Sequence, residues 1–219
     1  MIIKPLLPLK ITFKGRSFDN TILGETCFFK GGVARDAAIA ALEGKRKIEI
    51  FPRDLDLLVG RPSEELEELL VWSRADTRDL WDWVPEGLAP SQERLGAALL
   101  GSVSSDINLN ECLLGKDYIW VSSNFLDGWK RKVITPSWDS RGKELIRAHF
   151  FAFRYGYTAK CSLPQNNAYY SVVERKAEEL NLSADWAAYL APVPRLQEEE
   201  EEEIVVEVLL EDGTTMIIE

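Results

Sequence analysis

The stretch Phe28–Val59 reads FFKGGVARDAAIAALEGKRKIEIFPRDLDLLV and determines how the rest of the chain is organised. It opens on an apolar run, turns at Gly31–Gly32, continues as an alanine-rich segment to Glu43 and breaks at Gly44. A second apolar run then leads into Arg53–Asp56. The pattern predicts a strand, a glycine turn, a helix and a second strand that carries two carboxylates.

The glycine turn is a candidate phosphate site. Glycine allows a ligand to approach the backbone closely, and the first N–H groups of a helix have no partner within that helix. Because such a helix end favours anions, we expect Gly31 and Gly32 to lie against the phosphates of a nucleotide. Glycine turns of this kind also occur in proteins that bind no phosphate.

The second strand carries a candidate metal site. Side chains alternate along a strand, so Asp54 and Asp56 are expected to project from one face while Leu55 and Leu57 point into the core. Two carboxylates on one face repel each other unless a cation lies between them, and Mg²⁺ prefers oxygen ligands. The alternative is that both carboxylates lie on a solvent-exposed strand face and bind no metal.

The order of these motifs resembles a known family. Gly31–Asp36 followed by Asp54–Asp56 resembles the Gly-Gly-x-x-Arg-Asp and Asp-x-Asp signature of the head domain of poly(A) polymerases and CCA-adding tRNA nucleotidyltransferases, which belong to the polymerase-β-like nucleotidyltransferase superfamily. Asp106–Asn110 looks like the Asp-x-x-x-Asn element of that family, and Leu126–Lys130 looks like its later Asp-Gly turn. Leu145–Tyr157 is similar to the arginine- and aromatic-rich helix that opens the neck.

The resemblance implies an α/β (α+β) fold, with a nucleotidyltransferase head whose mixed β-sheet is flanked by helices and a short helical neck. It implies an enzyme that transfers nucleotides from ATP or CTP to an RNA 3′ end, with tRNA as one candidate. Asp54 and Asp56 are then the catalytic residues and the metal ligands, holding two Mg²⁺ ions. Gly31, Gly32 and Arg35 would bind the nucleotide.

The third motif adds two nucleotide-binding candidates, Asp106 and Asn110. The chain departs from the family here, because Ser104 and Ser105 stand where two arginines are usual. No Glu-Asp-x-x-Arg element that would recognise the incoming base is found in the neck, and we expect a head with a shortened neck and without the helical body. A structural ion pair between Arg35 and its neighbour Asp36 is the alternative to a nucleotide contact.

The charge of the chain is uneven. Its 219 residues carry a formal net charge of −10, but ten of the 36 acids lie in residues 197–219, and the other 26 balance the 26 Lys and Arg of residues 1–196. Residues 128–160 contain eight Lys or Arg residues and only two acidic residues. This stripe predicts an RNA-binding surface with Lys130, Arg147 and Arg154, although a merely solvated face is the alternative.

The remaining patterns divide the chain into a head domain (residues 1–140), a helical neck-like segment (141–196), an acidic linker (197–203) and a C-terminal β-hairpin (204–219). The head should end with a strand at 118–122, a turn at Asp127–Gly128 and a strand at 132–134. The acidic tail and hairpin could dock a protein partner or a second copy. No apolar run reaches transmembrane length, and prolines interrupt the N-terminal apolar run, so we expect a cytoplasmic protein without a membrane partner.

Two other functions remain open from the residues alone. One is transfer of a nucleotide to a protein or small molecule, and the other is a catalytically inactive head that serves as an RNA-binding or assembly module. The presence of both Asp54 and Asp56 beside the intact glycines argues against the second alternative, because a scaffold has no need of two like charges on one face.

Overall fold

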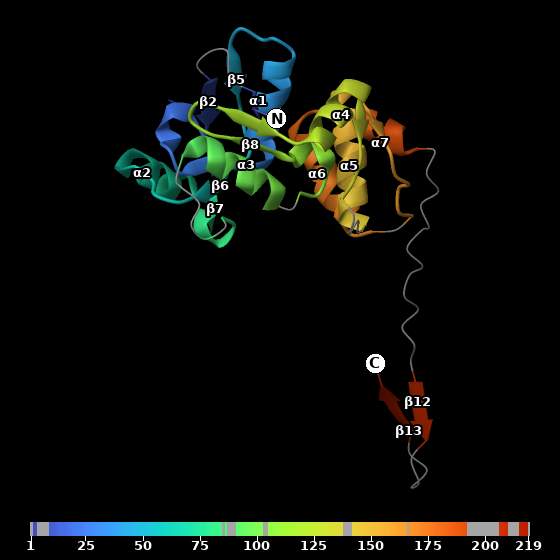
Figure 1. The fold of residues 1–219 in the computed structure, drawn as a ribbon. Helices are drawn as coiled ribbons and strands as arrows, with labels where there is room; N and C mark the ends of the chain where they lie inside the picture. Colours follow the sequence, from blue (N-terminus) through green and yellow to red (C-terminus); the bar gives the residue numbers. More distant parts are fainter. Residues whose placement is uncertain are drawn as a thin grey trace. The chain divides into compact units, whose positions relative to one another are not determined.

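The computed structural model describes residues 2–3, 9–84, 86, 91–102, 105–137, 142–165, 167–191, 206–209 and 215–218 (Figure 1). The chain forms two compact units, Met1–Ser162 and Leu163–Glu219. Within the described residues, the first unit contains helices α1 to α5, and the second contains α6, α7 and one pair of strands.

A six-stranded mixed sheet forms the centre of the first unit, in the order β1-β9-β8-β4-β6-β7. The strands are β1 (Ile2–Ile3), β4 (Cys27–Phe29), β6 (Asp56–Val59), β7 (Asp76–Asp79), β8 (Cys112–Leu114) and β9 (Ile119–Val121). All neighbouring strands pair antiparallel except β6 and β7, which are parallel. The mixed sheet and the α+β class agree with the sequence prediction.

Helices cover both faces of this sheet. Because side chains alternate along a strand, Phe28 and Phe29 point to opposite sides, and both are fully buried. Phe28 packs with Trp120 in a cluster that includes apolar residues of α3 (Gln92–Ser102), whereas Phe29 belongs to a larger cluster with α1 (Gly31–Leu42). The sheet is therefore apolar on both sides, and polar groups can gather only at its edges and strand ends.

A smaller three-stranded sheet contains β2 (Leu9–Phe13), β3 (Arg16–Asp19) and β5 (Ile48–Ile50). The single strand expected between Gly44 and Val59 is wrong, because β5 pairs with β2 while β6 belongs to the main sheet. Pro52 lies between them; it has no N–H to donate to a strand partner, which explains the interruption. Asp54 therefore lies in the bend before β6 and not within a strand.

Helix α2 (Glu64–Ser73) follows the main motif, and the sequence Pro62–Glu65, with a serine before acidic residues, predicts its start. Ser63 accepts a hydrogen bond from the backbone N–H of Leu66 at 3.2 Å, and acidic residues fill the first turn. This arrangement satisfies one of the unpaired N–H groups of the helix and complements its dipole. Leu66 is fully buried, so the helix packs against the core through its apolar side.

The predicted turn at Asp127–Gly128 is wrong, because these residues lie inside helix α4 (Ser123–Arg131). Ser122 begins this helix by accepting a hydrogen bond from the N–H of Phe125 at 2.9 Å. A Cβ atom at position 128 would overlap the Asn108 side-chain amide. Gly128 thus permits close packing of a helix, whereas its sequence context resembles a turn.

Helix α5 (Gly142–Tyr155) overlaps most of the helix predicted at Leu145–Tyr157 and belongs to the first unit. The short strands β10 (Val133–Ile134) and β11 (Thr158–Ala159) pair in parallel on either side of it in the sequence. The strand expected at 132–134 therefore exists, but it is not part of the main sheet. Lys132 ends α4 with a positive φ of 58° and turns the chain into β10.

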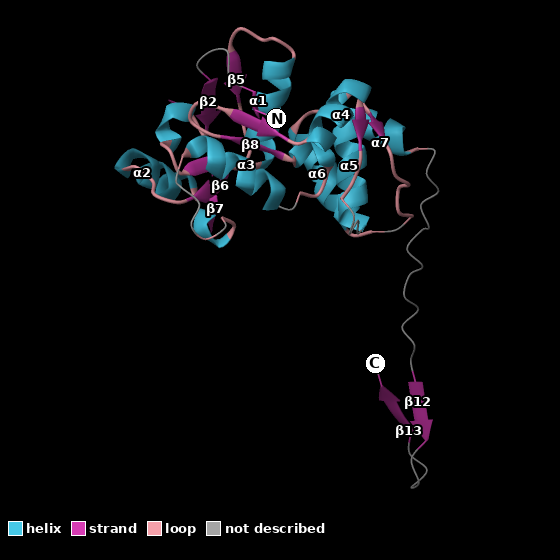
Figure 2. Ribbon diagram, viewed as in Figure 1, coloured by secondary structure: helices cyan, strands magenta, loops and turns pink. Residues whose placement is uncertain are grey.

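The second unit contains α6 (Tyr169–Glu179) and α7 (Ser183–Leu190), which lie within the segment predicted to be helical, residues 141–196. Trp186 of α7 is buried, as are apolar residues of α6. Strands β12 (Val206–Leu209) and β13 (Thr215–Ile218) pair antiparallel, as expected for the predicted hairpin (Figure 2). The predicted acidic linker, residues 197–203, lies outside the described residues. Among the helices of the described residues, none is both long and apolar enough to cross a membrane.

Candidate functional site

The first turn of α1 lies against the start of β6. Gly31 has a φ of 61°, which glycine adopts easily, and a Cβ atom at this position would lie only 2.7 Å from Oδ2 of Asp56. The backbone N–H of Lys30 donates to the carbonyl of Asp56 at 2.9 Å. Lys30 precedes the helix, and its side chain forms no hydrogen bond with the N–H groups of the first helical turn. The predicted glycine turn and the predicted carboxylate are therefore in direct contact.

Asp56, the first residue of β6, has a half-buried carboxylate. Its pKa is raised above the ordinary value by burial and by the nearby negative charges of Asp54 and Asp76, while Lys30 and Arg147 act in the opposite direction. Asp76 is opposite Asp56 in the parallel pairing of β6 and β7, so both residues occupy the same register position. We call Asp54, Asp56 and Asp76 the carboxylate edge.

Asp54 differs from its neighbour in exposure. Its side chain is 61% exposed and contacts the guanidinium of Arg53 at 3.2 Å. The strand alternation that was expected to align it with Asp56 is absent, but its carboxylate still lies close enough to raise the pKa of Asp56. The two predicted metal ligands are therefore close to each other because the chain bends at Asp54, and not because they alternate along one strand.

The carboxylate edge fits a hard divalent cation in its donor chemistry. Its oxygens are the ligands that Mg²⁺ prefers. A cation would also offset the repulsion from Asp54 and Asp76, which adds to the effect of burial on the pKa of Asp56. Across the described residues, no group of three or more His, Cys, Asp or Glu side chains is arranged to hold a metal by itself. Asp54 and Asp56 would therefore need oxygens from a substrate or from water to complete the coordination.

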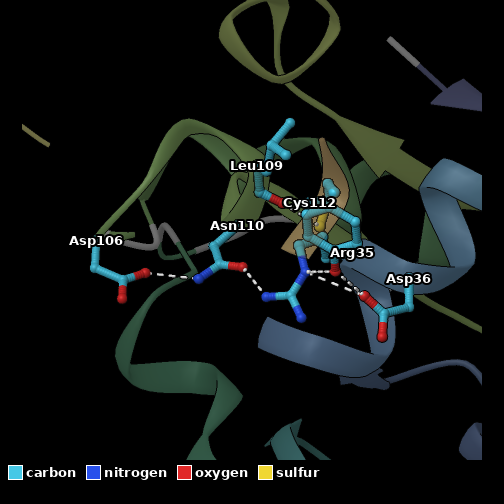
Figure 3. Close-up of polar contacts among 7 residues, drawn as sticks. Arg35, Asp36, Asp106, Leu109, Asn110 and Cys112 are labelled. Atoms are coloured by element: carbon cyan, nitrogen blue, oxygen red, sulfur yellow. Dashed lines mark hydrogen bonds and ion pairs between the residues drawn. The ribbon is translucent and has the colours of Figure 1, made fainter. Parts of the chain in front are cut away.

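A buried arginine lies further along α1. Arg35 is 4% exposed, and its Nε donates to the hydroxyl of Tyr155 at 2.8 Å and to Oδ1 of Asp36 at 3.1 Å. Its Nη1 donates to Oδ1 of Asn110 at 2.8 Å, as Figure 3 shows. The guanidinium also lies over the ring of Phe151, 4.3 Å from its centre. The ion pair with Asp36, one of the two roles considered for Arg35, is present.

Tyr155 of α5 completes this cluster. Its hydroxyl donates to Oδ1 of Asp36 at 2.6 Å, and burial raises its pKa to about 12. Burial alone would lower the pKa of Arg35, but Tyr155 and Asp36 outweigh it and raise that pKa above the ordinary value. Arg35 therefore remains charged, and its charge is balanced inside the protein.

The third motif connects α1 to α5. Asn110, at the end of the short helix η3 (Asn108–Asn110), donates through Nδ2 to Oδ1 of Asp106 at 2.6 Å. Figure 3 shows this hydrogen bond between Asn110 and Asp106. Oδ2 of Asp106 lies 2.7 Å from Nη1 of Arg147, so Asp106 links Asn110 to α5. We call the connected residues the arginine network. Its members are Arg35, Asp36, Asp106, Asn110, Arg147 and Tyr155.

The predicted residues thus fall into three sets. Gly31, Asp54 and Asp56 come together at the carboxylate edge, and Gly32 follows in the first turn of α1. The predicted nucleotide contacts Arg35, Asp106 and Asn110 join the arginine network, together with Arg147, which had been assigned to RNA binding. Lys130 and Arg154 lie outside both sets, on α4 and at the end of α5.

Sequence reasoning missed Asp76 and Tyr155. Asp76 lies in a strand whose four residues are all exposed, so no apolar pattern marked it. Tyr155 appeared only as one aromatic residue among several in α5. The signal that could have found it is its position two turns after Arg147 on the same helix, which brings both residues toward α1 and η3.

Compared with protein-family models and with curated proteins, the chain matches none. The case for a function therefore rests on the residues and on their geometry.

Proposed function

We propose that this chain is a nucleotidyltransferase that moves a nucleotide from ATP or CTP to the 3′ end of an RNA, with tRNA as the first candidate. The observation that carries the proposal is the contact between Gly31 at the start of α1 and the carboxylate of Asp56. It places a helix end that favours anions beside carboxylates that favour cations. A nucleoside triphosphate with its divalent cations presents both charges together.

The first turn of α1 would hold the phosphates. The N–H groups of Gly31 and Gly32 lie in the first turn, where no carbonyl of the helix is available to accept their hydrogen bonds. The side chain of Lys30 provides no cap for them. The side chain of Lys30 lowers the pKa of Asp56, which shows that its positive charge is close to this end of the helix. Backbone donors and the positive charge of Lys30 would both favour a phosphate at this end of the helix.

In the proposed reaction, the 3′ hydroxyl oxygen attacks the α-phosphorus, its proton leaves to solvent, and the bond to pyrophosphate breaks. The contribution of the protein is to position the reacting groups and to balance charge, and no covalent enzyme intermediate is needed. Asp54 and Asp56 would hold divalent cations, which when bound neutralise the phosphates and favour loss of the hydroxyl proton.

The arginine network would support the nucleotide from the α5 side. Asn110 uses one N–H for Asp106 and one oxygen lone pair for Arg35, and an amide group retains a second hydrogen and a second lone pair. Because both neighbours hold its side chain, Asn110 has a fixed orientation. A fixed amide can distinguish the hydroxyl groups of a sugar or the edge of a base.

The test is transfer of label from each α-labelled nucleoside triphosphate, with Mg²⁺, to a tRNA pool with and without its 3′-terminal nucleotides. We expect incorporation by the wild type and a loss of about a thousandfold or more in Asp54→Asn/Asp56→Asn, because the charges that hold the cations are gone. The matched control is Glu64→Gln/Glu65→Gln on exposed positions of α2, which also removes two negative charges. This control should retain full activity.

Other outcomes would favour other functions. Label on a protein or small molecule, and not on RNA, would support transfer to that acceptor. An assembly module has one observation in its favour, since Asp106 and Asn110 already bind partners within the protein. Absence of incorporation with every nucleotide and metal, together with intact folding, would refute the transferase and support that module.

A further inference from the structure

A hollow in the first unit has a volume of about 1020 Å³. The end of α3, the segment around η3, helix α4 and the β10–β11 pair surround it. Among the described residues, those of the carboxylate edge do not line it. Its size suits a small organic ligand, because such sites usually measure about 300–1,000 Å³.

The segment 105–111 forms a wall shared with the candidate site. Ser105, Asn108 and Glu111 line the hollow, whereas Asp106 and Asn110 bind each other and the arginine network. Asn108 is 93% buried, as its 7% exposed fraction shows, and its side chain binds the backbone of Val133 and Thr135. Hydrogen bonds thus hold Asn108 in place, and the third motif forms part of the wall of the hollow.

One carboxylate of the lining is held in place. Glu111 accepts hydrogen bonds from the hydroxyl of Ser122 and from the amide of Asn124, the second at 3.4 Å. All three residues line the hollow. A positioned carboxylate can accept hydrogen bonds from the hydroxyls of a ribose, as acidic residues do in dinucleotide sites.

Two cations of the lining could bind a phosphate. Arg131 pairs with Asp127 at 2.8 Å, but both side chains are more than half exposed, and an exposed pair of this kind is weak enough to exchange partners. Lys160 also lines the hollow, and its side chain is exposed. Apolar side chains such as Leu100 and Val133 provide a surface for a base. Carboxylate, cations and apolar surface together match the three parts of a ribonucleotide.

We propose that this hollow binds a ribonucleotide, with its ribose on Glu111 and its phosphate at Arg131 and Lys160. This assignment rests on the proposed function: the hollow holds the last nucleotide of the acceptor RNA, while the triphosphate binds at the start of α1. A free mononucleotide presents the same chemistry, so the source of the ligand is decided by measurement.

The experiment measures binding without catalysis, by fluorescence anisotropy of a short RNA labelled at its 5′ end and by calorimetry with AMP and CMP. Glu111→Gln removes the acceptor charge, and Thr158→Trp fills the hollow from an exposed position of β11. Each should weaken binding by about tenfold, the usual effect of losing a charge-assisted hydrogen bond or a ligand's space. The control Arg78→Gln on β7 removes an exposed positive charge outside the hollow and should leave binding unchanged.

The 3′ end itself gives a second test on the wild type. RNA that ends in a 3′-phosphate, or DNA of the same sequence, should bind about tenfold more weakly, because Glu111 would lose a ribose hydroxyl or face a negative charge. Loss of RNA binding in both variants identifies an RNA terminus as the ligand. Equal loss of AMP or CMP binding identifies a free nucleotide, and either result supports the site.

Two results would overturn the proposal: unchanged affinity in both variants with normal thermal unfolding, or no binding of RNA and mononucleotide by the wild type. Binding at the hollow without nucleotide transfer would refute only the proposed function. Transfer by both variants with an unchanged KM for RNA would refute only the hollow as the acceptor site.

Discussion

The carboxylate edge and the arginine network differ in how their charges are balanced. In the network, Arg35 binds Asp36 and Arg147 binds Asp106, so each charge meets its opposite at hydrogen-bonding distance. At the edge, burial and the like charges of Asp54 and Asp76 raise the pKa of Asp56, and the opposing effects of Lys30 and Arg147 do not cancel this. Unrelieved repulsion tends to persist in a folded protein where a function requires it. This difference agrees with our proposal that ligands bind at the edge and that the network supports them.

The largest expected change in stability comes from a substitution that disrupts the arginine network. Arg35→Met should lower the free energy of unfolding by about 3–5 kcal/mol, because Asp36 then remains as an uncompensated and partly buried charge. Urea denaturation at pH 7 measures this, with Arg78→Met as an exposed control that should change the value by less than about 0.5 kcal/mol. A loss no larger than that of the control would show that the network does not stabilise the fold.

The next effect concerns the contact between α1 and the edge. Gly31→Ala should cost about 1–2 kcal/mol for its positive φ and about 1–3 kcal/mol more for the overlap with Asp56. Gly44→Ala is the matched control, since it has a φ of 69° and nothing within 4 Å of its Cβ position. In an Asp56→Ala background, Gly31→Ala should cost no more than Gly44→Ala. An undiminished cost there would place the strain elsewhere.

A smaller effect tests the end of the network on α5. Arg147→Ala should lower the free energy of unfolding by about 1–3 kcal/mol, because Asp106 loses its charged partner. Arg147→Lys should restore part of this loss, since lysine supplies the charge without the planar guanidinium. Arg154→Ala on the same helix is the exposed control, and thermal unfolding compares the three. Equal losses at positions 147 and 154 would argue against the bridge.

The smallest effect is a pH dependence at the edge. The folded state raises the pKa of Asp56 above its ordinary 3.8, so ionisation of Asp56 opposes folding as the pH rises through that range. Asp56→Asn should therefore stabilise the protein at pH 7 by about a few tenths of a kcal/mol, and this gain should disappear below pH 3.8, where the carboxylate is protonated in both states. Melting temperatures at both pH values, with Asp82→Asn as an exposed control, measure the difference. A destabilised variant at pH 7 would contradict the repulsion.

Elements with local signals were predicted from the sequence. Ser63 and the acids after it marked the start of α2, and Gly31 marked the start of α1. Gly128 was misinterpreted because a glycine needed for helix packing looks the same in sequence as one needed for a turn. Strand β7 was missed because it joins the sheet through its backbone and buries none of its side chains.

The candidate site divides in the same way. Asp54 and Asp56 stand two residues apart and could be recognised as a pair. The hydrogen bond of Tyr155 to Asp36 joins residues 119 positions apart, and no spacing rule predicts such a contact. The sequence therefore indicated which residues carry charge near the site, while only the fold shows which of those charges are already paired.

The strand order of the main sheet also sets the sequence of events during synthesis on the ribosome. Strands β4 and β6 are joined through α1 and can pair early, but β1 pairs with Ile119 and Trp120 and must wait until both have left the exit tunnel. Until β8 emerges, the central strand β4 has an open edge that a chaperone or another nascent chain can bind. Thus β1 precedes every other strand of the main sheet in the sequence but is among the last to join it.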